Sequence, residues 1–281
     1  MKVIHNCSIY NFHKQYCLNI HNELLNRGHE SIIETSGEYH KDADFTIQPD
    51  ENSKNLGGKG VWIGHAFPVV PQNKFYLEDS FINDLNNNCD YIFTFSKEWK
   101  EWHKMHKLPT YNVGMPKLDT LFNNIEGGSI LFAPTHHNKP GVYSANKINE
   151  NLFETDYNII VRGHPAFHNN TESLEESLKK SSIVISDYSS VGLEAITLNI
   201  PTILIGDKSW VDYKNNHISG KADEAAIRVY NQEDLQKAID VYTKNPKHLE
   251  KERLQHSKIL CDHQKNSSKK FVDTLEKLIN V

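Results

Sequence analysis

Long apolar runs are absent from this 281-residue sequence, and their absence limits the classes of protein that it fits. No stretch approaches the roughly 18 apolar residues that are typical of a membrane-spanning helix. The opening residues, MKVIHNCSIYNF, hold too short an apolar run for a secretory signal peptide. We therefore expect a protein without a transmembrane segment, in the cytoplasm of a bacterium or of a phage-infected host.

Cysteine is scarce, and positive charge is not in excess. The four cysteines are scattered and form no CxxC pair, so we expect free thiols in a reducing compartment rather than a disulfide framework. The formal net charge of -5 argues against a globally basic, nucleic-acid-binding protein, while a local basic face remains open.

Several catalytic motifs are also missing. HExxH, the GxSxG nucleophile elbow and the Walker sequence GxxxxGK[ST] do not occur, and no GxGxxG follows the first expected strand. The sixteen histidines include two close pairs, at 103/106 and 136/137, without an obvious third ligand nearby. These absences argue against P-loop kinases and simple dehydrogenases, and we expect no metal site and no cofactor.

Short apolar runs alternate with helix-like stretches along the chain. Helices are expected at residues 12–27, 77–87 and 97–107, in the gaps between later strands, and throughout the part after residue 232. Strands are expected at residues 2–4, 31–33, 60–63, 91–95, 111–113, 129–133, 157–161, 183–185 and 202–205. This alternation predicts parallel sheets with helices on both faces.

A polar segment with paired glycines, residues 123–128, is the best candidate for a linker. It predicts an α/β protein of two Rossmann-like, doubly wound domains that face a central cleft, at residues 1–124 and 125–281. In such domains, ligands bind at the carboxyl ends of the strands.

The stretch SIVISDYSSVGLEAITLNIPTILIG, residues 182–206, places polar side chains between an expected strand and an expected helix. Ser189 and Ser190 stand where the helix begins, and a helix N-terminus offers N–H groups and a positive dipole end to a pyrophosphate. Glu194, about one turn further on, suits the hydroxyls of a ribose or a glycerol. The alternative is that Ser189 only caps the helix and that Glu194 faces solvent.

Two other strand ends carry polar groups of similar kind. Thr135 and His136 follow the strand at 129–133, and Arg162 and His164 follow the strand at 157–161. Three neighbouring strand ends of one domain therefore supply cationic and neutral hydrogen-bond donors, a set that suits a diphosphate.

A histidine follows a strand end in the first half of the chain as well. His65 is a candidate general base, because the ordinary pKa of histidine lies near neutrality. The alternative is a structural histidine that packs beside Trp62.

The expected helix at 97–107 places Lys97, Lys100, Lys104 and Lys107 on one face, with Trp99 beside them. This face predicts a binding surface for a polyanionic acceptor. The alternative is an ordinary solvated face, since glutamates dilute the charge.

Several of these segments, in order, resemble the CDP-glycerol glycerophosphotransferases of teichoic acid synthesis, which are GT-B transferases. Residues 113–121, VGMPKLDTL, resemble that family's G-x-P-[RK]-x-D-x-L segment, and residues 131–135, LFAPT, resemble its A-P-T strand end. Residues 163–165, GHP, resemble its His-Pro turn, and residues 186–191, SDYSSV, resemble its T-D-Y-S-S-V motif. The resemblance covers roughly residues 60–206.

The chain departs from the family pattern at two places. The family has Trp-His-Gly where this chain reads Trp62-Ile63-Gly64-His65, and it usually has Asp where this chain has Glu194. The base role is carried onto His65 across that difference in order.

The resemblance implies a GT-B fold in which the first domain holds a polyanionic or saccharide acceptor and the second holds CDP-glycerol or a UDP-sugar. Such folds often carry the last helix, here near residues 266–280, back onto the first domain. His65 would remove the proton from an acceptor hydroxyl, which attacks the donor. Arg162, His164, Ser189 and Ser190 would stabilise the leaving phosphate without a metal ion.

Two other functions stay open beside a transferase that builds a surface polymer. One is the same chemistry with a hydroxymethylated base of phage DNA as the acceptor. The other is an epimerase-like or non-catalytic nucleotide-sugar binder on the same fold.

Overall fold

The computed structural model describes ten stretches of the chain. They are residues 1–9, 13–50, 53–64, 85–102, 107–134, 151, 153–163, 170–187, 189–206 and 222–279. The chain divides into two compact units. Unit 1 comprises Met1–Ala66, Lys74–Thr120 and Cys261–Val281, and unit 2 comprises Phe67–Asn73 and Leu121–Leu260.

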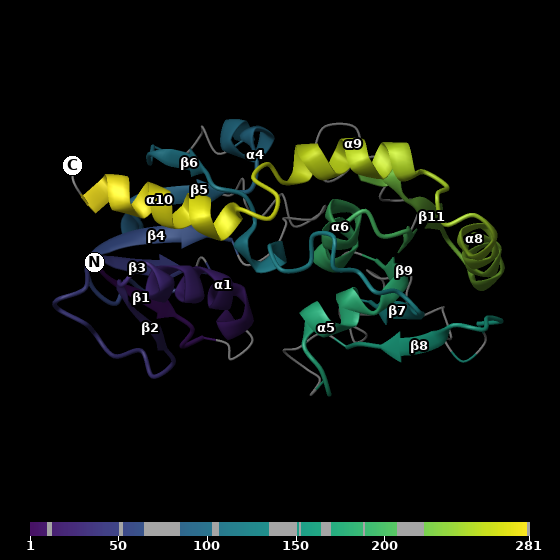
Figure 1. Cartoon of the computed structure of the whole chain (residues 1–281), viewed down its shortest axis with the longest axis horizontal. Coiled ribbons are helices and arrows are strands. Elements are labelled where there is room, and N and C mark those ends of the chain that lie inside the picture. The colour runs from purple at the N-terminus through teal and green to yellow at the C-terminus, as the bar shows by residue number, and fades with distance from the viewer. Residues whose placement is uncertain are drawn as a thin grey trace. The chain divides into compact units, whose positions relative to one another are not determined.

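Unit 1 is built on a six-stranded sheet in which every pair of neighbours is parallel (Figure 1). The strands are β1 (Lys2–Asn6), β2 (Glu30–Glu34), β3 (Phe45–Gln48), β4 (Lys59–Ile63), β5 (Tyr91–Thr94) and β6 (Thr110–Asn112). Their order is β2-β1-β3-β4-β5-β6. The direction of winding therefore reverses between β1 and β3, which is the topological switch point of a doubly wound sheet.

The C-terminal helix belongs to unit 1. The helices described in this unit are α1 (His13–Asn26), α4 (Lys97–Trp102), the 3₁₀ turn η2 (Pro116–Leu118) and α10 (Ser267–Ile279). α10 packs against α1 (Figure 1), and the ring of Phe271 lies edge-on to Phe93 of β5, with 4.7 Å between the centroids. The apolar face of α10 therefore completes the core of unit 1.

Two residues of the segment 113–121 fix the start of α10. Gly114 has a φ of +85°, and a Cβ there would lie 2.4 Å from the Oγ of Ser267, so only glycine fits. The Asp119 carboxylate accepts hydrogen bonds from the backbone N–H groups of Ser267 and Ser268, at 3.0 and 2.7 Å. These N–H groups are otherwise orphans of the first helical turn.

Unit 2 is built on a five-stranded sheet that is again parallel between all neighbours. The strands are β7 (Ser129–Ala133), β8 (Asn158–Val161), β9 (Ser181–Ser186), β10 (Thr202–Ile205) and β11 (Ile227–Val229). Their order, β8-β7-β9-β10-β11, repeats the order of the first five strands of unit 1. The switch point of this sheet lies between β7 and β9, and the predicted α/β class with doubly wound parallel sheets is confirmed.

Side chains cap the start of several helices of unit 2. The helices that the structure describes in this unit are α5 (Leu174–Lys179), α6 (Ser190–Thr197), the 3₁₀ turn η6 (Ala222–Ala225), α8 (Gln232–Lys244) and α9 (Glu250–Leu260). Ser173 and Glu176 form a capping box at α5, and Asn231 caps α8. α9 packs on α6, where Ser257 donates a hydrogen bond to the carbonyl of Thr197.

All nine expected strands are present, but two further strands, β3 and β11, escaped prediction. Most of the helix expected at 77–87 lies outside the described residues, and residues 85–88 are helical. Among the described residues, no helix combines the length and the apolar character needed to cross a membrane.

Candidate functional site

The switch point of unit 2 carries the first group of predicted site residues. The Oγ of Ser186, at the end of β9, donates a 2.8 Å hydrogen bond to the carbonyl of Ala133, at the end of β7. Ser186 is fully buried and Asp187 nearly so. This bond ties the two strands together where the SDYSSV segment leaves the sheet, so the start of α6 is anchored at the switch point.

The start of α6 is arranged by its own side chains. Ser189 is the N-cap, and its side chain accepts a hydrogen bond from the backbone N–H of Val191. The Oγ of Ser190 donates to Oε1 of Glu194 at 3.1 Å. Glu194 is only 1% exposed, so the alternative in which it faces solvent is wrong. The helix thus keeps a buried carboxylate one turn behind its N-terminus.

A glycine allows α6 to approach the sheet closely. A Cβ at Gly192 would lie 2.7 Å from a methyl group of Leu204 in β10. The apolar residues around it are buried, which holds the N-terminus of α6 at the carboxyl edge of the strands. Backbone N–H groups in this position suit an anion.

Arg162 lies at the end of β8, where the sequence predicts it, and it is largely buried. Its backbone N–H donates to the carbonyl of Phe132, and its Nη1 donates to the carbonyl of Glu172 at 2.6 Å. A guanidinium carries five N–H donors, and this bond fixes the direction of one of them. Lys180 chiefly, with a contribution from Arg162, holds the pKa of the Glu172 carboxyl below its usual range.

Five predicted site residues fall outside the described residues: His65, Lys104, Thr135, His136 and His164. The described chain stops next to several of them. Pro134 follows the end of β7, directly before Thr135. The carbonyl of Gly163, directly before His164, accepts a hydrogen bond from the side chain of Asn170. The roles of these five residues stay predictions.

Only some of the residues predicted to bind the acceptor on α4 are accessible in the structure. Trp99 is 1% exposed, and its ring lies edge-on to Phe95 in the core of unit 1. Such a ring is not available for stacking on an acceptor. Lys97 is exposed and Lys100 is half-buried, so the two lysines remain candidates for contact with a polyanion.

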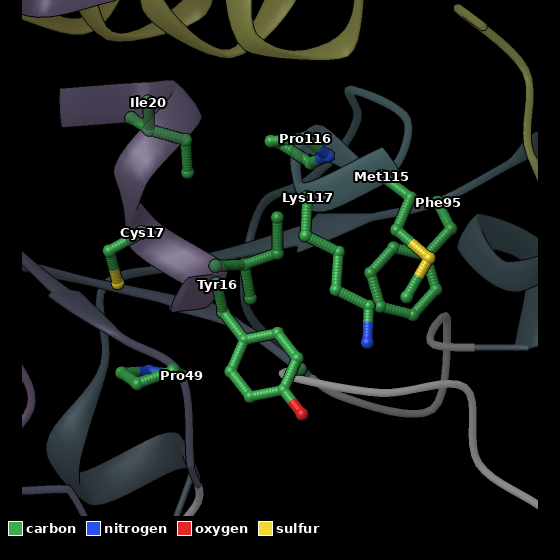
Figure 2. A pocket seen from close by; sticks show the side chains of 10 residues that line it. Tyr16, Cys17, Ile20, Pro49, Phe95, Met115, Pro116 and Lys117 are labelled. Atoms are coloured by element: carbon green, nitrogen blue, oxygen red, sulfur yellow. The ribbon is translucent and has the colours of Figure 1, made fainter. Parts of the chain in front are cut away.

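Unit 1 contains a small pocket, partly open to solvent, near the carboxyl ends of three central strands (Figure 2). Pro49 follows β3, Ile63 and Gly64 close β4, and Phe95 follows β5. The remaining walls come from α1 and from the turn η2. They are Tyr16, Cys17, Ile20, Met115, Pro116 and Lys117. The next residue after Gly64 in the sequence is His65.

The pocket is mainly apolar, with a few polar groups. The Nζ of Lys117 lies over the ring of Tyr16, 4.3 Å from its centroid (Figure 2). The sulfur of Cys17 is 3.8 Å from that of Cys7, and this contact, together with burial, keeps the pKa of Cys17 well above its ordinary value. Cys17 therefore presents a neutral thiol, and Lys117 brings positive charge to the described lining.

The sequence pattern predicts no site role for Lys117, which lies within the segment 113–121, or for Tyr16, which lies in the first expected helix. The basic position of that segment was the available signal for Lys117. Among the described residues, no group of three His, Cys, Asp or Glu side chains is placed to hold a metal ion.

Solved structures similar to this chain share its fold. The wall teichoic acid polymerase TagF matches with a TM-score of 0.67 and 14% identity, over 99% of this chain and 89% of that chain. UDP-GlcNAc 2-epimerase from Neisseria meningitidis, bound to UDP-GlcNAc, matches with a TM-score of 0.61 and 12% identity, over 99% and 100%. Spinosyn forosaminyltransferase SpnP matches with a TM-score of 0.55 and 12% identity, over the whole of both chains. The predicted GT-B class is thereby confirmed.

Sequence comparison identifies the family. No curated protein matches the sequence significantly. The profile of the family described as CDP-Glycerol:Poly(glycerophosphate) glycerophosphotransferase matches residues 78–277, which is most of the chain and includes every described part of unit 2. The chain therefore belongs to the CDP-glycerol:poly(glycerophosphate) glycerophosphotransferase family, as its ordered motifs predict.

Proposed function

We propose that the protein transfers glycerol phosphate from CDP-glycerol to a hydroxyl group of a polymeric acceptor. The donor binds at the carboxyl edge of the unit 2 sheet, and the acceptor binds to unit 1. The family match carries this proposal. Structures of TagF that had been soaked with CDPG support the choice of donor.

The start of α6 supplies the chemistry that a donor of this kind needs. Its N–H groups, with the hydroxyls of Ser189 and Ser190, face the diphosphate, and Glu194 accepts hydrogen bonds from the donor's hydroxyl groups. Arg162 and His164 add positive charge as the leaving phosphate develops its own charge. This assignment rests on the anchoring of α6 at the switch point and on the hydrogen bond from Ser190 to Glu194, which holds the carboxylate next to the first turn of the helix.

The transfer step is a displacement at phosphorus. His65 takes the proton of the acceptor hydroxyl, and the oxygen forms a bond to the β-phosphorus of the donor. The bond from that phosphorus to the bridging oxygen breaks, and CMP leaves. The cationic groups and the helix N-terminus stabilise the charge on CMP, so the proposed reaction proceeds without a metal ion and in the presence of EDTA.

Donor binding and product release test the proposal together. CDP-glycerol at a hundredfold excess over its Kd should stabilise the protein by about 2.7 kcal/mol, which a melting curve resolves. CMP should then be released in step with the incorporation of glycerol phosphate into the acceptor.

The competing functions give different products. Stabilisation by a UDP-sugar alone, with release of UDP, would replace the proposal with glycosyl transfer, and a mass increase of hydroxymethylated DNA would identify DNA as the acceptor. Interconversion of free UDP-sugars would indicate an epimerase. An absence of stabilisation by any nucleotide would contradict the donor site itself.

A further inference from the structure

The unit 1 pocket combines a cation with apolar walls. Lys117 is half-buried on η2, and Ile20, Ile63, Phe95 and Met115 surround the space near it. None of the described residues that line this pocket carries a carboxylate. An anion that enters such a space meets a lysine in surroundings of low dielectric constant, where charge–charge attraction is stronger than in bulk water.

Tyr16 holds the lysine in position. The ammonium group lies 4.3 Å from the ring centroid, which is within the range of a cation–π contact. The contact directs Nζ toward the pocket rather than away from it (Figure 2). It also covers one face of the ring, which makes Tyr16 a poor platform for stacking a nucleobase.

The position of the pocket bears on the reaction. Its described walls include the carboxyl ends of β3, β4 and β5. The wall at Gly64 is also where the sequence continues to His65, the predicted base.

We propose that this pocket binds a phosphodiester of the acceptor, with Lys117 as the residue that positions the phosphate and Tyr16 as its support. The inference rests on the proposed function, and it adds where the acceptor is held. Lys117 is a positioning residue, which sets the acceptor's terminal hydroxyl relative to the base.

The test uses glycerophosphoglycerol, a small diester with two glycerol ends, and the full-length protein. The chain has three methionines, and Met115 lines the pocket, so a methyl-labelled sample gives a simple NMR spectrum. We expect the Met115 methyl signal, assigned with Met115→Leu, to shift on titration with the diester. Glycerol alone should leave it in place, and raising the salt concentration should weaken the binding.

A second lysine–tyrosine pair provides the matched control. The Nζ of Lys59 lies 5.8 Å from the ring centroid of Tyr91, and Lys59 is at the start of β4, whereas the pocket is at its end. Lys117→Met should weaken binding of the diester by about tenfold or more, and Lys117→Arg should retain most of it. Lys59→Met should bind as the wild type does.

Two results would overturn the inference. One is a Lys117→Met protein that binds the diester as tightly as the wild type, and the other is a Met115 signal in the wild type that never moves. The second readout needs no variant, so it holds even where Lys117→Met does not fold. A shift caused by a hydroxymethylated oligonucleotide but not by the diester would also contradict it.

The experiments distinguish an error in the proposed acceptor site from an error in the proposed function. Stabilisation by CDP-glycerol reports on unit 2 and should be the same in Lys117→Met and in the wild type. If CDP-glycerol stabilises the protein but the diester does not bind, the pocket is wrong and the transferase stands. If neither binds, the proposed function fails as well.

Discussion

The Asp119 carboxylate accepts a 2.7 Å hydrogen bond from the backbone N–H of Ser268, a residue 149 positions further along the chain. A side chain from outside the helix thereby caps the N-terminus of α10. Asp119→Ala should lower the free energy of unfolding by about 1–2 kcal/mol, as loss of other caps does. Urea unfolding measures this. Asp42→Ala, at an exposed carboxylate paired with Lys2, is the control and should have little effect.

Hydrogen exchange adds a local readout for the same variant. The first-turn amides of α10 should exchange faster in Asp119→Ala, because they lose their acceptor. Equal protection of these amides in the variant and in the wild type would contradict the capping role.

Gly114 should tolerate alanine less well than Gly28 does. Both have positive φ, +85° and +76°, so both substitutions carry the cost of a left-handed backbone. A Cβ at Gly28 meets nothing within 4 Å, whereas at Gly114 it meets Ser267 at 2.4 Å. Gly114→Ala should therefore lower the melting temperature clearly more than Gly28→Ala. Equal losses would mean that the segment 113–121 moves away from α10 without cost.

Acid should destabilise unit 1 through a buried histidine. Burial, and secondarily the neighbouring His21, lowers the pKa of His5 to about 3. An unfolded chain has a histidine pKa of about 6.5, so below that pH the unfolded state binds a proton that the folded state does not. The free energy of unfolding should fall as the pH drops from 6.5 toward 3, by at most about 1.4 kcal/mol per pH unit from this group.

Urea unfolding between pH 7.5 and 5 checks this slope. His5 donates to or accepts from the Oγ of Ser31, and His5→Asn keeps a polar group there while it removes the titration. The variant should show a shallower decline than the wild type. Parallel curves would assign the acid sensitivity to other groups.

Replacing His65 separates catalysis from donor binding. His65→Ala should reduce the rate of CMP release by about 10²–10⁴-fold, the range for loss of a general base. Stabilisation by CDP-glycerol should be unchanged, because the proposed donor site lies in unit 2. An unaltered rate would remove His65 from the mechanism, and no transfer to any acceptor in the wild type would favour a non-catalytic binder.

Glu194→Gln tests the donor site with a change of charge and little change of shape. Hydrogen bonds to charged groups contribute about 1.5–3 kcal/mol, so the affinity for CDP-glycerol should fall by about tenfold or more. Glu233→Gln, at an exposed carboxylate of α8, is the matched control. Equal affinity in both variants would leave Glu194 with a structural role at the start of α6.

Local patterns predict most of this fold because most strands are continuous apolar runs. β3 differs, since Thr46 and Gln48 interrupt it and yet are fully buried. Thr46 donates to the carbonyl of Gly57, and Gln48 donates to that of Ser53, so both polar side chains are satisfied by a loop. The sequence of the strand alone does not show that these loop carbonyls will be its hydrogen-bond partners.

Some features of the candidate site could likewise be predicted from local sequence, and others could not. The hydroxyls at the start of α6 were predictable, because a capping pattern after a strand is local. The pairing of Lys117 with Tyr16 was not, because only the sheet brings η2 and the start of α1 together. Trp99 was predicted to bind the acceptor, because helical spacing places it beside the lysines. In the structure its ring packs against Phe95 in the core of unit 1 instead.

The return of α10 to unit 1 sets an order of assembly on the ribosome. Most of unit 2 lies between the second and third segments of unit 1, so its strands are made before α10. Phe93 therefore lacks Phe271, its buried partner, until unit 2 has been made. The strands of unit 1 are made first, but unit 2 is the first of the two that has all its described helices and strands available, although domains usually fold in order from the N-terminus. A nascent unit 1 leaves the apolar surface beneath α10 exposed to chaperones until the whole of unit 2 and then α10 have been made.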